Sequence, residues 1–571
     1  MAELQTTPLS RRENLIQVIK FVLFSISAGV IQVLVFALFE EVFHLPYWPS
    51  YLTALIASVL YNFTVNRHFT FKSANNVPKA MLQLGIYYAI FTPLSTWWGD
   101  ALIKAPIHSI ARDALARYER EYFDEKCPRS KRMIEEAKHY IPGGVQHNLA
   151  FNHPFPLVIT KAEGAYLHDL DGNRYFDLLQ AGGPTVLGSN PPAVREKVIA
   201  LLEDGGPSTG LFHEYEYKLA QKICDSVKSV EMFRMFNSGS EACMAAVRVA
   251  RLATGKKNIV KMGGAYHGWS DQFAYGIRIP GTRGMQAHGV PSYLFRHTQE
   301  FFPNRIKDLE RVLRRNRARG GTAAVFIEPI GPESGTRPLD FDFNKEVQAL
   351  CRRYGALLVF DEVVTGFRLG MGGAQGYFDI DPDLTIFGKV IAGGYPGAGG
   401  LGGKKEYMRY LAAGIQTGDK IKKALVGGTM AATPISCVAG YYTLEEIERT
   451  NACNTAALMG DRLTAGLQAL IEQHKLPFVA FNQGSICHLE TVGTVHFFIN
   501  WKKPWTIPSL INETAKRKKE MEYMGAAYMA EGVVTLAGSR MYTSAAYTEE
   551  MIDEVIAAFD RVFSHVRLIE E

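Results

Sequence analysis

The segments LLVFDEVVTGFR, at residues 357–368, and DPDLTIFGK, at residues 381–389, decide the fold of this chain. In the first, an apolar run ends in two carboxylates, the first of them Asp361. In the second, a short hydrophobic run ends in a glycine followed by Lys389. Short apolar runs bounded by turn residues are typical of buried strands in a parallel sheet. We therefore expect Asp361 and Lys389 at the ends of neighbouring strands.

Asp361 and Lys389 are the two groups that pyridoxal 5'-phosphate chemistry requires. A lysine amine forms a Schiff base with the cofactor aldehyde, and a carboxylate keeps the pyridine nitrogen protonated so that the ring can accept electrons. Once displaced by the substrate amine, Lys389 would move a proton between the substrate Cα and the cofactor C4'. That role requires a dry site that keeps the lysine pKa low. We predict that both residues are catalytic.

Composition sets further bounds on function. The chain has 571 residues, which is enough for two or three domains. The net charge of +5 is too small to indicate a nucleic-acid partner. The seven cysteines are scattered and never form CxxC, which favours reduced thiols in a cytosolic compartment and predicts no metal site. The first apolar run is too long for a secretory signal and lacks a small-residue cleavage site.

Residues 1–106 differ sharply in composition from the rest. Three apolar runs, at about 16–39, 47–65 and 81–103, contain few charges. The first is long enough to cross a hydrocarbon core of about 30 Å. We expect three apolar helices that attach the chain to a membrane. Buried helices of a soluble domain are the alternative.

The N-terminal motifs resemble those of the GtrA-like family, small four-helix membrane proteins linked to moving lipid-linked sugars. The resemblance rests on KFVLFSISAGVIQ at residues 20–32 and on YNF, NR and FTF within residues 61–71. A fourth span is missing, because the chain turns polar after Pro106. The resemblance therefore implies a truncated membrane segment. Because the cofactor is cytoplasmic, we expect the catalytic domain in the cytoplasm, with the topology of the third run left open.

The remainder of the chain predicts an α/β enzyme. Residues 107–128 are charge-rich and suggest a solvated helical linker. Alternating apolar residues around Asp-Gly-Asn within residues 164–177 predict a β-hairpin. Strands alternating with helices predict a mostly parallel central sheet with ligands at its carboxyl edge. We expect a large cofactor domain at about 185–435 within residues 129–571, and a smaller α+β domain from the flanking segments.

Three further elements could contact the cofactor. The turn Ser238-Gly239-Ser240 precedes a helical pattern, and the free N–H groups of a helix start suit a phosphate. Such a turn is also a common N-cap. Tyr266 follows a strand-like run and could stack on a flat ring. Thr429 lies beside glycines and could reach a phosphate.

Seven motifs, taken in order, resemble blocks of the class III (fold type I) aminotransferases, most closely the glutamate-1-semialdehyde aminomutase branch. They are PGGV at 142–145, GAYLHDLDGNRYFD at 164–177, NSGSEA at 237–242, YHG at 266–268, DEVVTGFR at 361–368, PDLTIFGK at 382–389 and GGTM at 427–430. The resemblance implies the fold type I architecture and pyridoxal phosphate as the cofactor, with amino and keto compounds as substrates.

The resemblance also implies roles for individual residues. Lys389 would be the Schiff-base lysine, Asp361 the partner of the pyridinium nitrogen, and Tyr266 and Val363 the residues packed on the two ring faces. The cofactor-binding set is Ser238, Gly239, Ser240, Tyr266, His267, Asp361, Val363, Lys389 and Thr429. Thr429 would reach the phosphate of the partner subunit, which implies a homodimer with shared active sites.

Departures from the aminomutase pattern favour transamination of an amino acid or amino sugar-type substrate. Residues 146–151 contain no arginine for a substrate carboxylate, Glu333 replaces an asparagine, and the acidic gating motif near residues 536–542 is missing. In many class III aminotransferases such a glutamate pairs with an arginine that binds a carboxylate and swings aside for other substrates. We hypothesise that Glu333 and Arg540 form this substrate pair. Two unrelated surface charges are the alternative.

Three other functions stay open at this stage. A 2,1-aminomutase is the second candidate, and an amino-acid racemase or epimerase is the third. Both stay open because they share the same proton transfers with transamination. A membrane accessory of polysaccharide assembly with a merely tethered enzyme-like domain belongs to a different class. The intact Lys389 and Asp361 argue against that last function.

Overall fold

The computed structural model describes residues 27, 30–32, 34–36, 38–39, 50, 53–54, 56–58, 60–61, 106–150, 152–414, 422–501 and 503–569. The chain divides into two compact units, residues 1–104 with 503–508 and residues 105–502 with 509–571. We call the second the main unit. Most of the three predicted apolar helices lie outside the described residues. Among the residues that are described, no helix is both long and apolar enough to cross a bilayer.

The described strands are β1 (Ile107–Ile110), β2 (Ile159–Glu163), β3 (Tyr166–Asp169), β4 (Arg174–Asp177), β5 (Met232–Phe236), β6 (Asn258–Met262), β7 (Thr298–Phe301), β8 (Thr322–Ile327), β9 (Leu357–Glu362), β10 (Leu384–Gly388), β11 (Gly399–Gly403), β12 (Val479–Gln483), β13 (Ile486–Glu490), β14 (Val533–Val534), β15 (Arg540–Tyr542) and β16 (Val566–Ile569). The described α-helices are α4 (Arg112–Tyr118), α5 (Pro128–Ala137), α6 (Pro192–Asp204), α7 (Glu214–Ser226), α8 (Gly239–Thr254), α9 (Ile306–Arg317), α10 (Pro332–Gly335), α11 (Phe343–Tyr354), α12 (Gly373–Phe378), α13 (Lys405–Met408), α14 (Pro434–Thr450), α15 (Ala452–Gln473), α16 (Ile507–Ala530) and α17 (Glu549–Phe563).

A seven-stranded sheet forms the centre of the main unit. Its strand order is β5-β11-β10-β9-β8-β6-β7. Strands β10, β9, β8, β6 and β7 run parallel to one another, while β11 is antiparallel to both β10 and β5. This mixed, mostly parallel sheet confirms the predicted fold class.

Helices cover both faces of this sheet, as the alternation of side chains along β8 shows. Ala324 and Phe326 pack with the apolar face of α8. Val325 and Ile327 point the other way and pack with α9 and α11. Successive strand residues face opposite sides, so a strand buried on both faces is apolar throughout.

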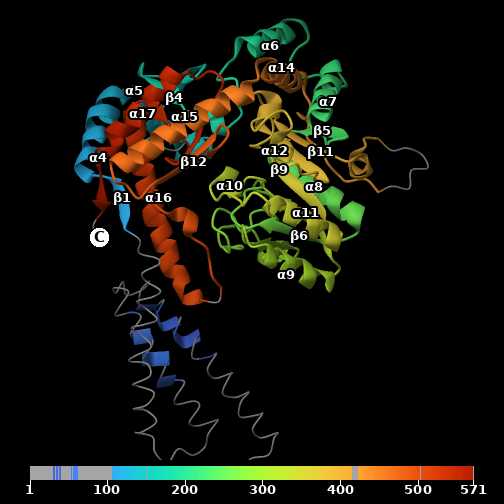
Figure 1. The fold of residues 1–571 in the computed structure, drawn as a ribbon, viewed down its shortest axis with the longest axis horizontal. Coiled ribbons are helices and arrows are strands. Elements are labelled where there is room, and N and C mark those ends of the chain that lie inside the picture. The colour runs from blue at the N-terminus through green and yellow to red at the C-terminus, as the bar shows by residue number, and fades with distance from the viewer. Residues whose placement is uncertain are drawn as a thin grey trace, which may run out of the picture. The chain divides into compact units, whose positions relative to one another are not determined.

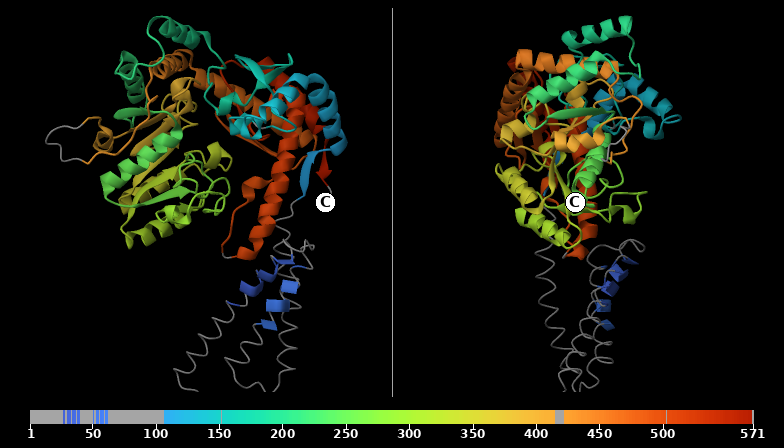
Figure 2. Two further views of the ribbon diagram at one scale, coloured as in Figure 1. Left: turned by 180° about the vertical axis from the view of Figure 1, so that it is seen from behind. Right: turned by 90° about the vertical axis from the view of Figure 1, so that its right-hand side faces the viewer.

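Smaller sheets form the remainder of the main unit. β2, β3 and β4 form a four-stranded sheet with β14, and β12, β13 and β15 form a three-stranded one. The predicted hairpin is present as antiparallel β3 and β4. Helices α15 and α17 share an apolar core with β12 and β13, and α14 lies beside α6 and α7 (Figures 1 and 2). These elements form the smaller domain and the cover around the central sheet.

Residues 107–128 differ from the solvated linker that we expected. β1 pairs with β16 near the opposite end of the chain. On α4, Leu115 and Tyr118 are buried in the same core as Phe559 of α17. The charged residues lie on the outer face of this segment. They dominate its composition, so the short run of buried apolar residues was not recognised in the sequence. The main unit therefore begins with folded structure.

Candidate active site

Lys389 and Asp361 lie on adjacent parallel strands, as predicted. Asp361 on β9 is in register with Ile386 on β10, and Lys389 directly follows the last residue of β10. Lys389 has a φ of +51°, a left-handed backbone that lysine adopts at a cost of about 1–3 kcal/mol. Burial and, after it, the charge of Arg540 lower the pKa of its amine to about 8. A lysine with such a pKa can act as nucleophile and base near neutral pH.

Asp361 is held by groups that its own strand does not supply. His267 donates from Nδ1 to Asp361 Oδ2 at 2.7 Å, and the backbone N–H of Val363 donates to Oδ1 at 3.1 Å. Burial lowers the pKa of His267. Its ring packs against Phe273 and Phe326. A buried neutral imidazole therefore fixes the orientation of the carboxylate.

The predicted phosphate turn opens α8. Ser238 is its N-cap, and its hydroxyl accepts from the Glu241 N–H at 3.3 Å. A Cβ on Gly239 would lie 2.8 Å from Val363 Cγ2. A Cβ on Gly268 would lie 2.3 Å from Ser240 Oγ. The turn, Val363 and the Tyr-His-Gly motif therefore pack together with no room for an added methyl group.

Tyr266 and Thr429 occupy more open positions. Tyr266 is 48% exposed, and its N–H donates to the carboxylate of Glu328 at 2.8 Å. Thr429 is exposed. A Cβ on the neighbouring Gly428 would lie 2.5 Å from Asn237 Nδ2, so this loop passes close to the phosphate turn. The contacts that we predicted for these two residues with the cofactor stay predictions.

Glu333 and Arg540 are close together in space although 207 positions separate them in the chain. Arg540 Nη2 lies 3.8 Å from Glu333 Oε2, and Nη1 donates to the Glu333 carbonyl at 3.0 Å. The other carboxylate oxygen, Oε1, lies 3.9 Å from Arg278 Nε. Because Arg540 also lowers the pKa of Lys389, its charge acts at the lysine. Their role with substrate stays a prediction.

Two residues important for this geometry had no predicted role. Glu328 follows β8 and accepts from the N–H groups of Tyr266, Glu333 and Ser334 at 2.8, 2.9 and 2.7 Å. Burial raises its pKa to about 7. Arg368 is fully buried and donates to the carbonyl of Gly183 and to the side chain of Gln180. Glu328 could have been suspected because it is an acid at a strand end, and Arg368 because it ends a quoted motif.

The residues present fit pyridoxal phosphate. Lys389 offers a buried amine of lowered pKa, Asp361 a carboxylate fixed by His267, and the turn before α8 the free N–H groups of a 16-residue helix. The small side chains of that turn leave its backbone accessible. This donor set matches an aldehyde, a ring nitrogen and a phosphate.

Comparison with known proteins identifies both parts of the chain. The family described as "Aminotransferase class-III" matches residues 149–561. A glutamate-1-semialdehyde 2,1-aminomutase from Lachnoclostridium phytofermentans is 34% identical over 449 residues, which cover 77% of this chain and all of that protein. The family described as "GtrA/DPMS, transmembrane domain" matches residues 20–110, which confirms the N-terminal resemblance and associates the chain with a membrane.

Solved structures show the same fold. An omega-transaminase from Sphaerobacter thermophilus has a TM-score of 0.68 at 26% identity, over 77% of this chain and 98% of that one. A β-phenylalanine aminotransferase from Variovorax paradoxus has a TM-score of 0.65 at 27% identity, over 79% of this chain and 96% of that one. These similarities confirm the fold type I aminotransferase architecture of the main unit.

Proposed function

The chain belongs to the class-III aminotransferases, enzymes that use pyridoxal 5'-phosphate, and from this premise we propose that it transfers an amino group between two separate small substrates. The expected donors and acceptors are amino acids or amino sugar-type amines and their keto counterparts. The observation that supports transfer is the Glu333–Arg540 pair, with 3.8 Å between Arg540 Nη2 and Glu333 Oε2. If one of the two substrates carries a carboxylate and the other does not, the enzyme needs a cation, here Arg540, that binds the carboxylate of the first and moves aside for the second.

Each residue has a defined task in this proposal. Bound pyridoxal phosphate supplies an electron-accepting ring that makes the substrate Cα–H acidic. Lys389 would anchor the cofactor and, as a free amine, carry the proton from the substrate Cα to the cofactor C4'. Asp361 keeps a proton on the ring nitrogen. Ser238, Gly239 and Ser240 hold the phosphate through backbone and hydroxyl donors.

The substrate side of Lys389 combines an apolar contact with a cation. A Cβ on Gly182 would lie 3.0 Å from Leu149 Cδ1 and 4.0 Å from Lys389 Nζ, so an apolar side chain adjoins the lysine. The stretch around Leu149 is the one in which aminomutases carry an arginine. Arg540 would then be the main carboxylate anchor, and Glu333 would hold it when a substrate without a carboxylate is bound.

An aminomutase is the second candidate, because the aminomutase relative is 34% identical over its full length. A mutase returns the amino group to the same carbon skeleton, whereas a transaminase releases a keto product after the first half-reaction. The two therefore differ in whether product leaves before the second substrate arrives.

Spectroscopy of the purified full-length enzyme tests the proposal. Amines and amino acids are added one at a time, and the absorbance of the bound cofactor is followed together with release of a keto product. Stoichiometric conversion to the pyridoxamine form with release of a keto product supports transamination. A rearranged amino product without keto-acid release would establish the aminomutase. With a substrate deuterated at Cα, loss of the deuterium and no other change would indicate a racemase.

We also propose a homodimer with the catalytic part in the cytoplasm. Thr429 is exposed together with Gly427, Gly428 and Met430, so this turn is accessible to a second copy. Mixing inactive Lys389→Ala chains with inactive Thr429 variants should restore part of the activity if the sites are shared. Protease added outside sealed cells should leave the main unit intact, and its cleavage there would refute the cytoplasmic placement.

A further inference from the structure

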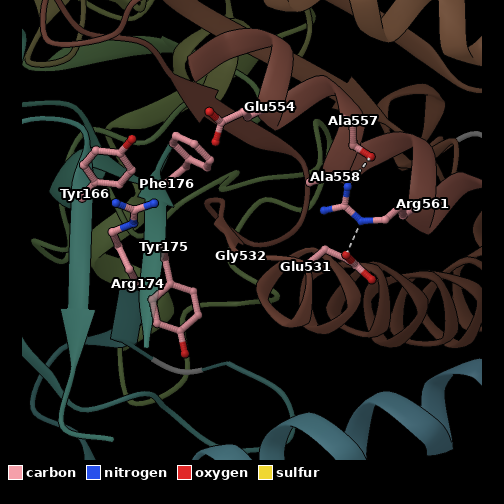
Figure 3. Close-up of a pocket in the computed structure, with 10 residues that line it drawn as sticks. All are labelled: Tyr166, Arg174, Tyr175, Phe176, Glu531, Gly532, Glu554, Ala557, Ala558 and Arg561. Carbon is pink, nitrogen blue, oxygen red and sulfur yellow. Dashed lines mark hydrogen bonds and ion pairs between the residues drawn. The ribbon is translucent and has the colours of Figure 1, made fainter. Parts of the chain in front are cut away.

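A pocket of about 320 Å³ lies away from Lys389 in the main unit. Its walls come from β3 and β4 on one side, and from α17 and the two residues that follow α16 on the other (Figure 3). None of the predicted catalytic or cofactor-binding residues lines it. The volume falls at the lower end of the range for small-molecule sites, about 300–1,000 Å³, and far exceeds the space of one water.

Charges of both signs line this pocket and differ in whether they are paired. Arg561 Nε pairs with Glu531 at 2.5 Å, and Tyr118 donates to the same carboxylate at 2.8 Å. Within the described part of the chain, neither the Arg174 guanidinium nor the Glu554 carboxylate has a hydrogen bond or ion pair. Arg174 instead stacks over the Tyr166 ring at 4.5 Å. The pocket therefore offers one cation and one anion that a ligand can satisfy.

Aromatic side chains supply an apolar wall. Phe176 lies between Tyr166 and Tyr547, with ring centroids 5.1 Å and 6.4 Å away. Figure 3 shows Glu554 projecting above Phe176 and Arg561 reaching from α17 toward the strands. A dianion would be repelled by the Glu554 carboxylate, and a purely apolar ligand would engage neither of the two exposed charges, Arg174 and Glu554.

We propose that this pocket is an effector site for a free amino acid with an apolar side chain. The carboxylate of the ligand binds the Arg174 guanidinium, the ammonium faces Glu554, and the side chain packs on Phe176. Charge-assisted hydrogen bonds at both ends make the zwitterion the preferred ligand class.

The strand that lines the pocket also leads to the active site. Asp177 ends β4, and its Oδ1 accepts from the Gln180 N–H at 2.7 Å. Gln180 in turn accepts from Arg368 at 2.9 Å. Two residues further on, a Cβ at Gly182 would lie 4.0 Å from Lys389 Nζ. A ligand that shifts β4 is therefore connected through three residues to the environment of the lysine.

Calorimetry with N,N-dimethyl-L-valine tests the binding. As its protonated ammonium, this tertiary amine keeps a carboxylate, one N–H and an apolar side chain but cannot condense with the cofactor aldehyde. The cofactor-loaded full-length protein should bind one molecule per chain. Arg174→Gln and Glu554→Gln should each weaken binding about tenfold, which corresponds to about 1.4 kcal/mol. Arg314→Gln, an exposed arginine change on α9, is the matched control and should leave binding unchanged.

A rate measurement tests the effector role separately. The probe should change the rate of cofactor conversion by an amine donor at least twofold in the wild type and not in Arg174→Gln. Absence of saturable binding, or equal binding by wild type, Arg174→Gln and Glu554→Gln, would overturn the site. An unchanged rate, or inhibition that persists in Arg174→Gln, would overturn the effector role, since it places the probe at the active site. The binding result does not depend on which amino-group reaction the enzyme performs.

Discussion

Replacing Glu333 by glutamine tests whether Arg540 is held in reserve for a carboxylate substrate. Arg540 contacts Glu333 twice, through the carboxylate at 3.8 Å and through the backbone carbonyl at 3.0 Å. The substitution removes the negative charge and keeps the carbonyl contact. It also keeps the size and shape of the side chain. Any change in substrate affinity therefore reports the loss of the Glu333 charge, which faces both Arg540 and Arg278.

The geometry sets the size of the expected effect. The Arg540 and Glu333 side chains are 20% and 25% exposed, so the pair is neither fully solvated nor dry. Two unit charges at this separation attract by about 4 kcal/mol at an effective dielectric constant of about 20. Desolvation and side-chain ordering offset most of this, which leaves about 1–2 kcal/mol. When Arg540 leaves Glu333 to bind a substrate carboxylate, it gives up this roughly 1–2 kcal/mol of ion-pair energy. Removing the Glu333 charge should therefore lower KM for the carboxylate substrate about 5- to 30-fold.

Steady-state kinetics with one carboxylate substrate and one amine without a carboxylate provide the assay. Glu333→Gln should lower KM for the first and raise it for the second, because the arginine is no longer drawn aside. Arg278→Gln is the control. Its guanidinium lies 3.9 Å from Glu333 and is 67% exposed, so KM should change less than twofold. Equal KM values for wild type and Glu333→Gln with both substrates would refute the switch.

Three further predictions concern the lysine, the N-terminal segment and a buried histidine. Lys389→Ala should abolish turnover and the visible absorbance of the lysine-bound cofactor; a variant that kept both would contradict its role. Leu115→Ala should lower the free energy of unfolding by about 2–4 kcal/mol because Leu115 is buried in the core with α17, whereas a loss below about 0.5 kcal/mol would favour a solvated segment. Burial and the charge of Arg540 lower the pKa of His488 from 6.5 to about 3. The unfolded chain is therefore protonated first on acidification, so this site contributes stability above pH 6.5 that is lost as the pH falls toward 3. Between pH 6.5 and 5 the loss is about 2 kcal/mol. In denaturant titrations between pH 6.5 and 5, the free energy of unfolding of His488→Phe should fall by about 2 kcal/mol less than that of the wild type. An equal pH dependence in both proteins would exclude His488 as the cause.

The sequence predicted the parts of the fold in which local pattern and tertiary environment agree. Continuous apolar runs became buried parallel strands, and acid or lysine at their ends became neighbours because parallel strands end at one edge. It did not predict β1, whose partner β16 lies more than 450 residues further along the chain. It also missed β11, since Gly-Gly-Leu-Gly-Gly carries no strand signal. Its glycines are required by packing: a Cβ on Gly400 would lie 2.4 Å from the Phe233 ring.

The residues that position the site were harder to predict than those proposed to react. Glu333 and Ser334 have φ values of +51° and +60°, an unfavourable backbone for both. Their N–H groups converge on the buried carboxylate of Glu328, which also accepts from the N–H of Tyr266 in the loop after β6. These contacts span 5, 6 and 62 positions, so no periodic pattern indicates them. One acid at the end of β8 thus compensates the strained turn that carries Glu333 and fixes the distance between Glu333 and Arg540. If Glu333 and Arg540 act on substrates as we propose, selectivity depends on Glu328, a residue that we do not expect to touch either substrate.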